Sequence, residues 1–567
     1  MEKIKLLKGK VNNIIGYIKA TEKRRTIATA IITTLIILFG LLTVIYYISG
    51  PAKGYMTSDT TDSLEWAEEY RQSGSLVSDE YHYAAILPFG GNQIFLPFLA
   101  MFGYSMEAQV CGLITFAILL CAAIMYLLRS LDLGWIASAS VTSGFMLLMS
   151  SSKKLREIMW EHIFYYNLGI LFFCVGFALA IRILRDGPSL KLTKSAKIMK
   201  IARFLLFLLF CTLTAMDGLQ AMACLSVPLI FAILFRCFLN NETPLFSRKN
   251  IWNGVIAGGV LIFSIIGMII LNAISGNVTA DYAESYSTYS SLSNVVNNFL
   301  KQFVNWFELF GVNYLPGDEL MSMDSVINII RIAVSLVILI TPWAMLTKYK
   351  KIESNAIKTV LLGHVGVSAF IVFACSFGNL GNVSWRLTPM LGTSIIVTAL
   401  AGIEMAKRKG VIKRIGVVTL ISMILCSFIT FMDIAEMPSD YGKNNSWHSL
   451  AKELEARDLQ YGYASFWWAN STKMISGEVH LACVSIRPSG ITKDKYQSRK
   501  DSWDNKDTDE YFLVMTEQEY LSMGGWIQNQ YSMGKIIDYF TVESTPYDIW
   551  GAKGTQVHVF VFSENLF

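Results

Sequence analysis

Long apolar runs separated by short polar segments are the main pattern along this 567-residue chain. Eleven of these runs approach or reach the roughly 20 residues that a helix needs to cross a bilayer. They predict spans near 27–48, 109–128, 135–150, 164–183, 202–216, 219–235, 251–272, 326–346, 359–376, 390–405 and 415–432. The chain is therefore expected to be a mainly α-helical, polytopic membrane protein.

Two apolar stretches contain turn-forming residues. Asp217-Gly218 interrupts residues 204–235, and basic residues flank both ends, so this block is predicted to be a hairpin of two short spans. Residues 83–103 contain Pro88, Gly90, Gly91 and Pro97. Because Pro and Gly break regular structure, this stretch is predicted to be re-entrant or interfacial rather than a span.

Basic residues cluster in the N-terminal segment and in the loops at 182–203, 236–249, 347–358 and 407–414. Basic loops remain in the cytoplasm, so the N-terminal segment 1–26 is expected inside. Eleven spans then place the C-terminus outside. The first outer loop is residues 49–108, which are rich in carboxylates.

The span-containing region is expected to cover residues 27–432 and to include an amphipathic helix at 293–310. Val295, Phe299, Phe303, Phe307 and Phe310 recur there at helical spacing, which is typical of a helix lying on a membrane surface. Residues 433–567 have the composition of a soluble domain. WHSLAKELEARDL predicts a helix, YFLVMTEQEYL a strand leading into a helix, and TQVHVFVFS a strand, so the C-terminal domain is expected to be extracytoplasmic and α/β.

Composition agrees with this organisation: 53% of the residues are hydrophobic and 16% are charged, with a net charge of +5. The nine cysteines have no metal or disulfide spacing, and we interpret them as packing residues. The sequence contains neither a phosphate-binding glycine loop followed by Lys-Ser/Thr nor a paired-histidine zinc motif. An ATP-driven pump is therefore not expected, nor is a nucleic-acid partner.

Asp59 is the first carboxylate after the first predicted span. It precedes a predicted helix, so two roles fit its side chain: capping the helix or acting as a general base. A solvated acidic face is predicted for the carboxylates that follow at helical spacing, Glu65, Glu68 and Glu69. Asp62 and Asp79 are further candidates for orienting an acceptor or holding a metal.

The second outer loop, SSKKLREIMWEHIFYYN (151–167), carries cations against the charge trend. Lys153, Lys154 and Arg156 would bind lipid headgroups in general or a phosphate carried by a specific lipid. Three titratable neighbours accompany them, Glu157, Glu161 and His162. Arg386 and Arg331, each at the outer end of a predicted span, either bind phosphate as well or simply extend to the membrane surface.

This organisation resembles the GT-C superfamily of membrane glycosyltransferases, which includes protein mannosyltransferases and aminoarabinose transferases. The shared features are a basic N-terminus, one span, and a long outer loop with an early acidic residue, here Asp59. The run GGNQIFLPFLAMFG (90–103) then leads into the second span. Shorter similarities are EHIFYYN, at Phe164, Tyr166 and Asn167, and WRLTP, at Arg386 and Pro389. SDTTD stands where the mannosyltransferases have an Asp-Glu pair.

The resemblance implies an inverting transfer of a sugar from a polyprenyl-phosphate donor to an acceptor in the cell envelope. Asp59 would be the catalytic base. The phosphate would be bound by cations, namely Lys153, Lys154, Arg156, Arg386 and Arg331. Glu157 or Glu161 would orient the acceptor or hold a divalent metal. The implied partners are the lipid-linked donor, membrane lipids and an extracytoplasmic acceptor.

Three other functions fit part of the pattern. A transporter or flippase would use ionisable residues in the spans, for which Asp217 and His364 are the candidates. A polysaccharide polymerase or ligase would place its large outer loop between late spans. A non-catalytic membrane scaffold would keep the GT-C-like architecture and bind partners through its C-terminal domain.

Overall fold

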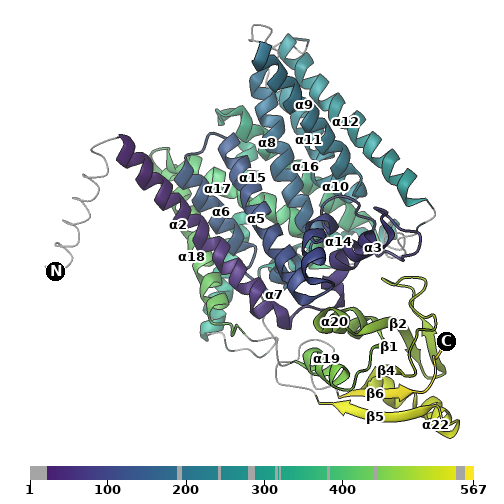
Figure 1. Cartoon of the computed structure of the whole chain (residues 1–567). Helices are drawn as coiled ribbons and strands as arrows, with labels where there is room; N and C mark the ends of the chain where they lie inside the picture. Colours follow the sequence, from purple (N-terminus) through teal and green to yellow (C-terminus); the bar gives the residue numbers. More distant parts are fainter. Residues whose placement is uncertain are drawn as a thin grey trace.

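A bundle of long helices with a small α/β domain at one end makes up the computed structural model (Figure 1). The structure describes residues 22–187, 194–239, 244, 246–276, 278, 288–312, 317, 319, 321–379, 383–439, 445–543 and 556–567. Ten helical segments in these ranges are long and apolar enough to cross a membrane, and Trp135–Leu148 is a shorter apolar helix. Together they account for all eleven predicted spans.

The bundle helices follow the chain in order, with α10 and α11 forming one span. They are α2 (Glu22–Ser49), α5 (Met106–Ser130), α6 (Trp135–Leu148), α8 (Tyr165–Asp186), α9 (Lys194–Ala215), α10 (Gly218–Cys224), α11 (Ser226–Leu239), α12 (Arg248–Ser275), α15 (Met323–Thr347), α16 (Asn355–Phe377), α17 (Thr388–Ala406) and α18 (Gly410–Ala435). α17 is central and is buried from Thr388 to Gly402. α12 and α18 are peripheral and leave Ile269 and Ile424 exposed, as expected of surfaces that contact lipid.

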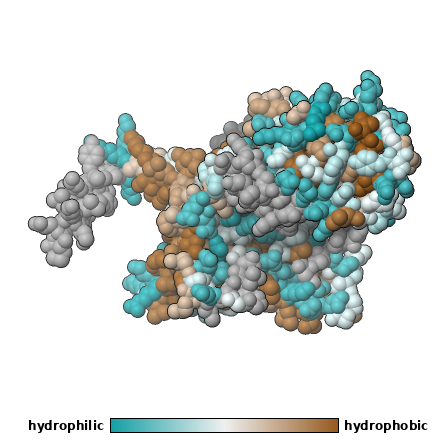
Figure 2. Space-filling model, turned by 90° about the horizontal axis from the view of Figure 1, so that it is seen from below, coloured by the Kyte–Doolittle hydropathy of each residue, from teal (hydrophilic) through white to brown (hydrophobic). Residues whose placement is uncertain are grey.

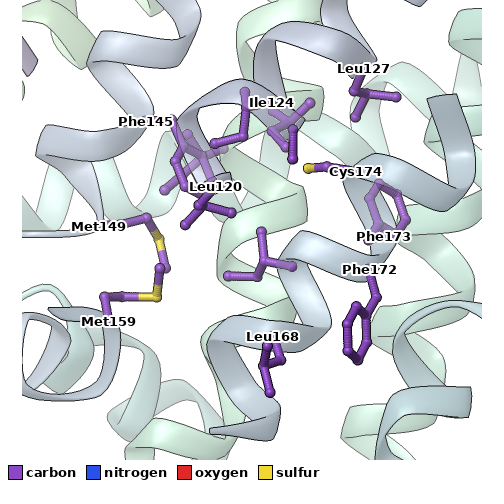
Figure 3. Close-up of a cluster of buried hydrophobic side chains, with 14 of the residues drawn as sticks. Leu120, Ile124, Leu127, Phe145, Met149, Met159, Leu168, Phe172, Phe173 and Cys174 are labelled. Atoms are coloured by element: carbon purple, nitrogen blue, oxygen red, sulfur yellow. The ribbon is translucent and has the colours of Figure 1, made fainter. Parts of the chain in front are cut away.

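The bundle core extends to the polar loops at the domain end. Figure 3 shows Leu120, Ile124 and Leu127 of α5 lying near Phe145 of α6 and Phe173 and Cys174 of α8. Met149 and Met159 are also fully buried, and their side chains point toward one another in the same view. The chain between these two methionines is therefore anchored to the core at both ends.

The segment 83–103 does not span the bundle. It contains α4 (Leu96–Phe102), which is far too short to cross a bilayer. Phe95 packs so closely on α5 that a Cβ at Gly112 would lie 2.2 Å from its ring. The backbone N–H of Phe89 donates to Asp217 Oδ1 at 2.7 Å, which fastens the segment to the turn between α9 and α10.

The predicted amphipathic helix is α14 (Val295–Leu309). Its polar residues Gln302 and Asn305 are buried against the bundle together with Trp306 and Leu309. Val296, Leu300 and Val304 are exposed by 68%, 57% and 66%. One apolar face of α14 is thus exposed, whereas Phe310, which the sequence places with the apolar residues of this helix, is fully buried.

The C-terminal domain is α/β, as the sequence predicts. Its six-stranded sheet has the order β3-β2-β1-β4-β6-β5, in which β1 is parallel to β2 and β4. The strands are β1 (Tyr461–Ala464), β2 (His480–Arg487), β3 (Gly490–Lys493), β4 (Tyr511–Thr516), β5 (Ile536–Val542) and β6 (Val557–Phe562).

Helices cover both faces of this sheet. One face packs on α19 (Ser446–Ala456) and α20 (Phe466–Ser476), and the other on α21 (Glu517–Ser522) and α22 (Gly524–Ser532). α20 lies between the sheet and the helix bundle (Figure 1). In the view from below, hydrophilic residues cover much of the domain, and hydrophobic residues gather on the exposed bundle helices (Figure 2).

Candidate functional site

Asp59 lies in a short 3₁₀ turn, Ser58–Thr61, directly before α3 (Asp62–Ser73). The hydroxyls of Thr60 and Thr61 donate to the carbonyls of Thr57 and Ser58, at 2.6 and 2.7 Å, and stabilise this turn locally. Ser58 Oγ also accepts a hydrogen bond from the backbone N–H of Ser471 in α20, at 3.1 Å. The C-terminal domain therefore helps to position Asp59.

Three of the five predicted phosphate-binding cations lie on one helical turn, α7 (Lys153–Arg156). Ser152 caps this turn by accepting from the N–H of Leu155 at 2.9 Å, and its hydroxyl donates to the carbonyl of Leu309 in α14 at 2.6 Å. Arg156 Nη1 donates to the carbonyl of Ser150 at 3.0 Å. The turn is thus held between the bundle and α14.

A π-helical turn, Glu157–Glu161, follows at once. Such wide turns often occur at functional sites because they re-aim side chains. Asn167 secures the chain beyond it: its Nδ2 donates to the carbonyl of His162 at 2.7 Å, and its Oδ1 accepts from the N–H of Phe164 at 2.9 Å. In this structure Asn167 positions the backbone after the π-helical turn.

Asp59, Lys154 and Glu157 are close enough to interact electrostatically, and we call this group the Asp59 cluster. Burial, and then the negative charge of Glu157, raise the pKa of Asp59 to about 6, while the positive charge of Lys154 opposes the shift. Lys154 Nζ lies 2.8 Å from Glu157 Oε1 and 4.2 Å from the centre of the Trp385 ring. Asp59 therefore titrates close to neutral pH, which suits a general base.

Glu161 is buried beside the end of α2, where Tyr47 Oη donates to its Oε1. Burial and Glu157 raise the pKa of Glu161 to about 8, against the opposing effects of Tyr47 and Arg156. Within the described residues, Glu161 Oε2 has no hydrogen-bond partner. Glu161 is accordingly a neutral carboxylic acid at pH 7, with one O–H to donate.

Aromatic rings accompany each cation of α7. Lys153 Nζ lies 4.8 Å from the centre of the Tyr55 ring, and Arg156 Cζ lies 5.5 Å from that of Tyr47. Burial lowers the pKa of Lys153, although Glu161 and Glu157 oppose the shift. Aromatic faces attract cations without neutralising them, so these rings help to hold the three cations in place.

His162 adjoins Asp59 through its ring: Nδ1 lies 3.5 Å from the Asp59 carbonyl oxygen. Burial lowers the pKa of His162 to about 4. The ring stacks on Phe164 at 5.9 Å. Its imidazole is therefore neutral at pH 7.

The other predicted site residues lie in different surroundings. Arg386 is buried in the turn Ser384–Leu387, next to the Trp385 that Lys154 contacts. Arg331 forms an ion pair with Asp433 of α18 at 2.6 Å. Asp62 is buried with its pKa raised by burial and by Asp59 and Glu65, and Asp79 is exposed on the first loop.

The prediction of a solvated acidic face on α3 is wrong. Glu65 is 5% exposed and pairs with Lys473 of α20 at 3.0 Å. Glu69 is 2% exposed and pairs with Arg499 at 2.6 Å. These carboxylates are buried because the C-terminal domain docks on them, and no local sequence signal reveals such a partner.

Sequence reasoning also missed Tyr47, Tyr55 and Trp385. Tyr47 ends an apolar span and Trp385 begins another, and aromatic residues at such positions usually indicate the membrane interface. The predicted metal remains a prediction: among the described residues, no group of three or more His, Cys, Asp or Glu side chains is placed to hold an ion.

Comparison with known proteins finds no matching protein-family model and no matching curated protein. Solved structures do match. ArnT from Cupriavidus metallidurans, crystallised with undecaprenyl phosphate, has a TM-score of 0.48 and 12% identity, over 93% of this chain and 98% of that chain. The similarity therefore extends over most of both chains.

The oligosaccharyltransferase of Archaeoglobus fulgidus is also similar. In its structure tethered to an acceptor peptide with the NVT sequon, the TM-score is 0.42 and the identity 10%, over 92% of this chain and 74% of that chain. For its complex with Zn and sulfate, the TM-score is 0.42 and the identity 11%, over 92% of this chain and 73% of that chain. Because these TM-scores are below 0.5, the function of this chain has to follow from its own residues.

Proposed function

We propose that this protein is a membrane glycosyltransferase that transfers a sugar from a polyprenyl-phosphate donor to an extracytoplasmic acceptor, with inversion at the anomeric carbon. The observation that carries the proposal is that the Asp59 carboxylate has a pKa of about 6 and lies beside Lys154 at the domain end of the bundle. A base and a phosphate-binding cation thus lie within electrostatic reach of each other.

In the proposed reaction, the Asp59 carboxylate accepts the proton of an acceptor O–H or N–H group. The acceptor atom bonds to the anomeric carbon as the bond from that carbon to the phosphate oxygen breaks. The electron pair of the broken bond leaves with the polyprenyl phosphate. Proton removal by a positioned base typically contributes roughly 10²–10⁴-fold to the rate.

The cations of α7 would bind the departing phosphate. Lys153, Lys154 and Arg156 lie on one turn, and the ion pair with Glu157 fixes the position of Lys154. Positive charge that is fixed before the reaction stabilises negative charge as it develops on the leaving group. We assign Arg386 to the same role because its turn carries Trp385, which contacts Lys154.

Glu161 and His162 are suited to orienting the acceptor. Both are uncharged at pH 7, since the pKa of Glu161 is about 8 and that of His162 about 4. They supply a hydrogen-bond donor and an acceptor for the incoming substrate, and neither adds a negative charge that would repel the donor phosphate. Arg331, already paired with Asp433, and the exposed Asp79 have no part in the scheme.

The orientation belongs to the proposal as well. The basic loops predict that the domain end faces outward, and α14 lies at that end with its apolar face exposed. An isoprenoid donor that diffuses in the outer leaflet would then reach α7 from the membrane.

The residues that favour a transporter have internal partners. Asp217 accepts from the N–H of Phe89, and His364 Nδ1 lies 2.9 Å from Thr393 Oγ1. Both contacts connect segments of the bundle, which is a structural role. Ionisable groups in a transport pathway would instead face a water-filled route.

Transfer by the purified protein in liposomes tests the proposal, with a polyprenyl-phosphate sugar fraction from cell membranes as donor. Asp59→Asn should lower transfer by about 10²–10⁴-fold and leave lipid-phosphate retention, measured by mass spectrometry, unchanged. Lys154→Gln should reduce that retention. Glu80→Gln is the matched control, because Glu80 is an exposed carboxylate of the same loop. Wild-type activity in Asp59→Asn would refute the assignment of the base.

A further inference from the structure

A polar cavity of about 310 Å³ lies at the end of the bundle far from the C-terminal domain. The ends of α8 and α11 and the beginnings of α12 and α16 surround it. These helix ends are at the top of the bundle in Figure 1, whereas the β-sheet is at the bottom. The cavity is therefore separate from the Asp59 cluster.

Arg236 is the central residue of this cavity. It is only 7% exposed, and its Nη1 donates to Thr359 Oγ1 at 2.8 Å. Among the ion pairs between described residues, none involves Arg236. A guanidinium has five N–H donors, and burying its charge is costly unless an anion compensates it.

The other charged groups of the lining leave an excess of positive charge. Arg185 is paired with Asp132 at 2.8 Å, so these two side chains neutralise each other. Lys249 then adds a second positive charge to that of Arg236. Lys358, one turn into α16, is also buried nearby, over the ring of Tyr349 at 5.1 Å.

Two helix N-termini add to this positive potential. α12 is capped by Ser247 and α16 by Ser354, whose hydroxyls each accept a backbone N–H at 3.3 Å. Residues of both first turns, Asn250 and Asn355, line the cavity. The N-terminus of a long helix carries a partial positive charge and presents N–H groups, which favours anions and especially phosphate.

We propose that this cavity binds a phosphate group. Three independent features converge on it: a buried guanidinium without a carboxylate partner among the described residues, a second cation, and two helix N-termini. The source is either the headgroup of an anionic lipid or a soluble phosphate. Exposed apolar residues on the adjoining helices, Phe238 and Ile251, would contact the acyl chains of a lipid.

The test uses the full-length protein and two probes, inorganic phosphate and phosphatidylglycerol nanodiscs, with phosphatidylcholine nanodiscs as reference. We expect a probe to raise the Tm of the wild type and, for the lipid, to remain bound in native mass spectrometry. Arg236→Gln should weaken binding at least tenfold. Lys249→Gln should weaken binding less; because Lys249 is exposed, this second variant should fold even if Arg236→Gln does not.

Arg203→Gln is the matched control, because Arg203 is at the same end of the bundle but is paired with Asp186 outside the cavity. A response to phosphatidylglycerol alone identifies a lipid source, and a response to inorganic phosphate identifies a soluble one. Both results support the proposal. If neither probe changes the Tm, or if both cavity variants bind like the wild type, the proposal is wrong.

Discussion

At the scale of single residues, the charged neighbours of Asp59 shift its pKa in opposite directions. Burial and Glu157 raise it to about 6, and Lys154 lowers it. Each neighbour can be neutralised by an isosteric or nearly isosteric change. The pH dependence of activity can therefore test the base separately from the absolute rate.

We expect the rate of transfer to rise with pH around a midpoint near 6, because only the ionised Asp59 accepts a proton. Glu157→Gln removes a negative charge and should move this midpoint to lower pH. Lys154→Gln removes a positive charge and should move it to higher pH. Rates of transfer measured from pH 4.5 to 8.5 give the midpoint for each variant. If both variants shift the midpoint in the same direction, another group controls the pH profile.

Glu161 gives a second prediction, on stability. The ordinary pKa of a glutamate side chain, 4.5, applies to the unfolded chain, and the pKa of Glu161 in the folded protein is about 8. The folded state thus binds the proton more tightly, so this group's contribution to stability falls as the pH rises from 4.5 to 8. Glu161→Gln, which mimics the neutral acid, should gain stability relative to the wild type over that interval.

Thermal unfolding in detergent at pH 5 and pH 8 measures this difference. Glu107→Gln, a change at an exposed carboxylate at the start of α5, should show the same difference from the wild type at both pH values. A Glu161→Gln profile parallel to that of the wild type would mean that Glu161 is ionised in the folded protein.

At the scale of elements, α14 buries Gln302 and Asn305 together with Trp306 and Leu309 and leaves an apolar face exposed. Trp306 connects the helix to the protein: it is 2% exposed, and its Nε1 donates to the carbonyl of Ser335 at 3.0 Å. Since the C-terminal end of α14 also contacts Ser152, the helix supports the turn that carries the cations.

Trp306→Ala should therefore lower the free energy of unfolding by about 3–5 kcal/mol, the usual cost of truncating a buried aromatic residue. Leu300→Ala on the exposed face of α14 should have a small effect, because Leu300 is 57% exposed. Chemical unfolding of both variants in the same detergent gives the comparison. Equal losses would indicate that the exposed face of α14 also packs against protein.

At the scale of the whole molecule, two ion pairs join the C-terminal domain to α3, Glu65–Lys473 and Glu69–Arg499. Trp66 Nε1 adds a hydrogen bond to Gln497 Oε1 at 3.0 Å. The domain thereby covers the segment that carries Asp59. Its docking should stabilise the geometry of the site as well as the domain itself.

Arg499→Gln should destabilise the protein by about 3 kcal/mol, because it leaves the buried carboxylate of Glu69 without its counter-ion. The double variant Glu69→Gln/Arg499→Gln should lose less than the sum of the two single variants, since it leaves no unpaired charge. The free energies of unfolding of the wild type, the two single variants and the double variant together form a double-mutant cycle. Additive losses would show that the pair contributes little to docking.

The sequence alone determined the membrane architecture of this protein. All eleven predicted spans coincide with helices, and α19, β4 and β6 lie where the C-terminal pattern predicts them. These features follow from local hydropathy and periodicity, because a helix satisfies its backbone hydrogen bonds within one segment. Lys153, Lys154, Arg156, Glu157 and Glu161 are also neighbours along the chain, so the sequence already grouped them.

Only the tertiary structure decided which charges meet. Glu65 and Lys473, like Glu69 and Arg499, are more than 400 residues apart, and Arg331 is 102 residues from Asp433. The burial that raises the pKa of Asp59 likewise depends on packing between distant segments. Electrostatic energies depend on distance and desolvation in space, and neither quantity is encoded in local spacing.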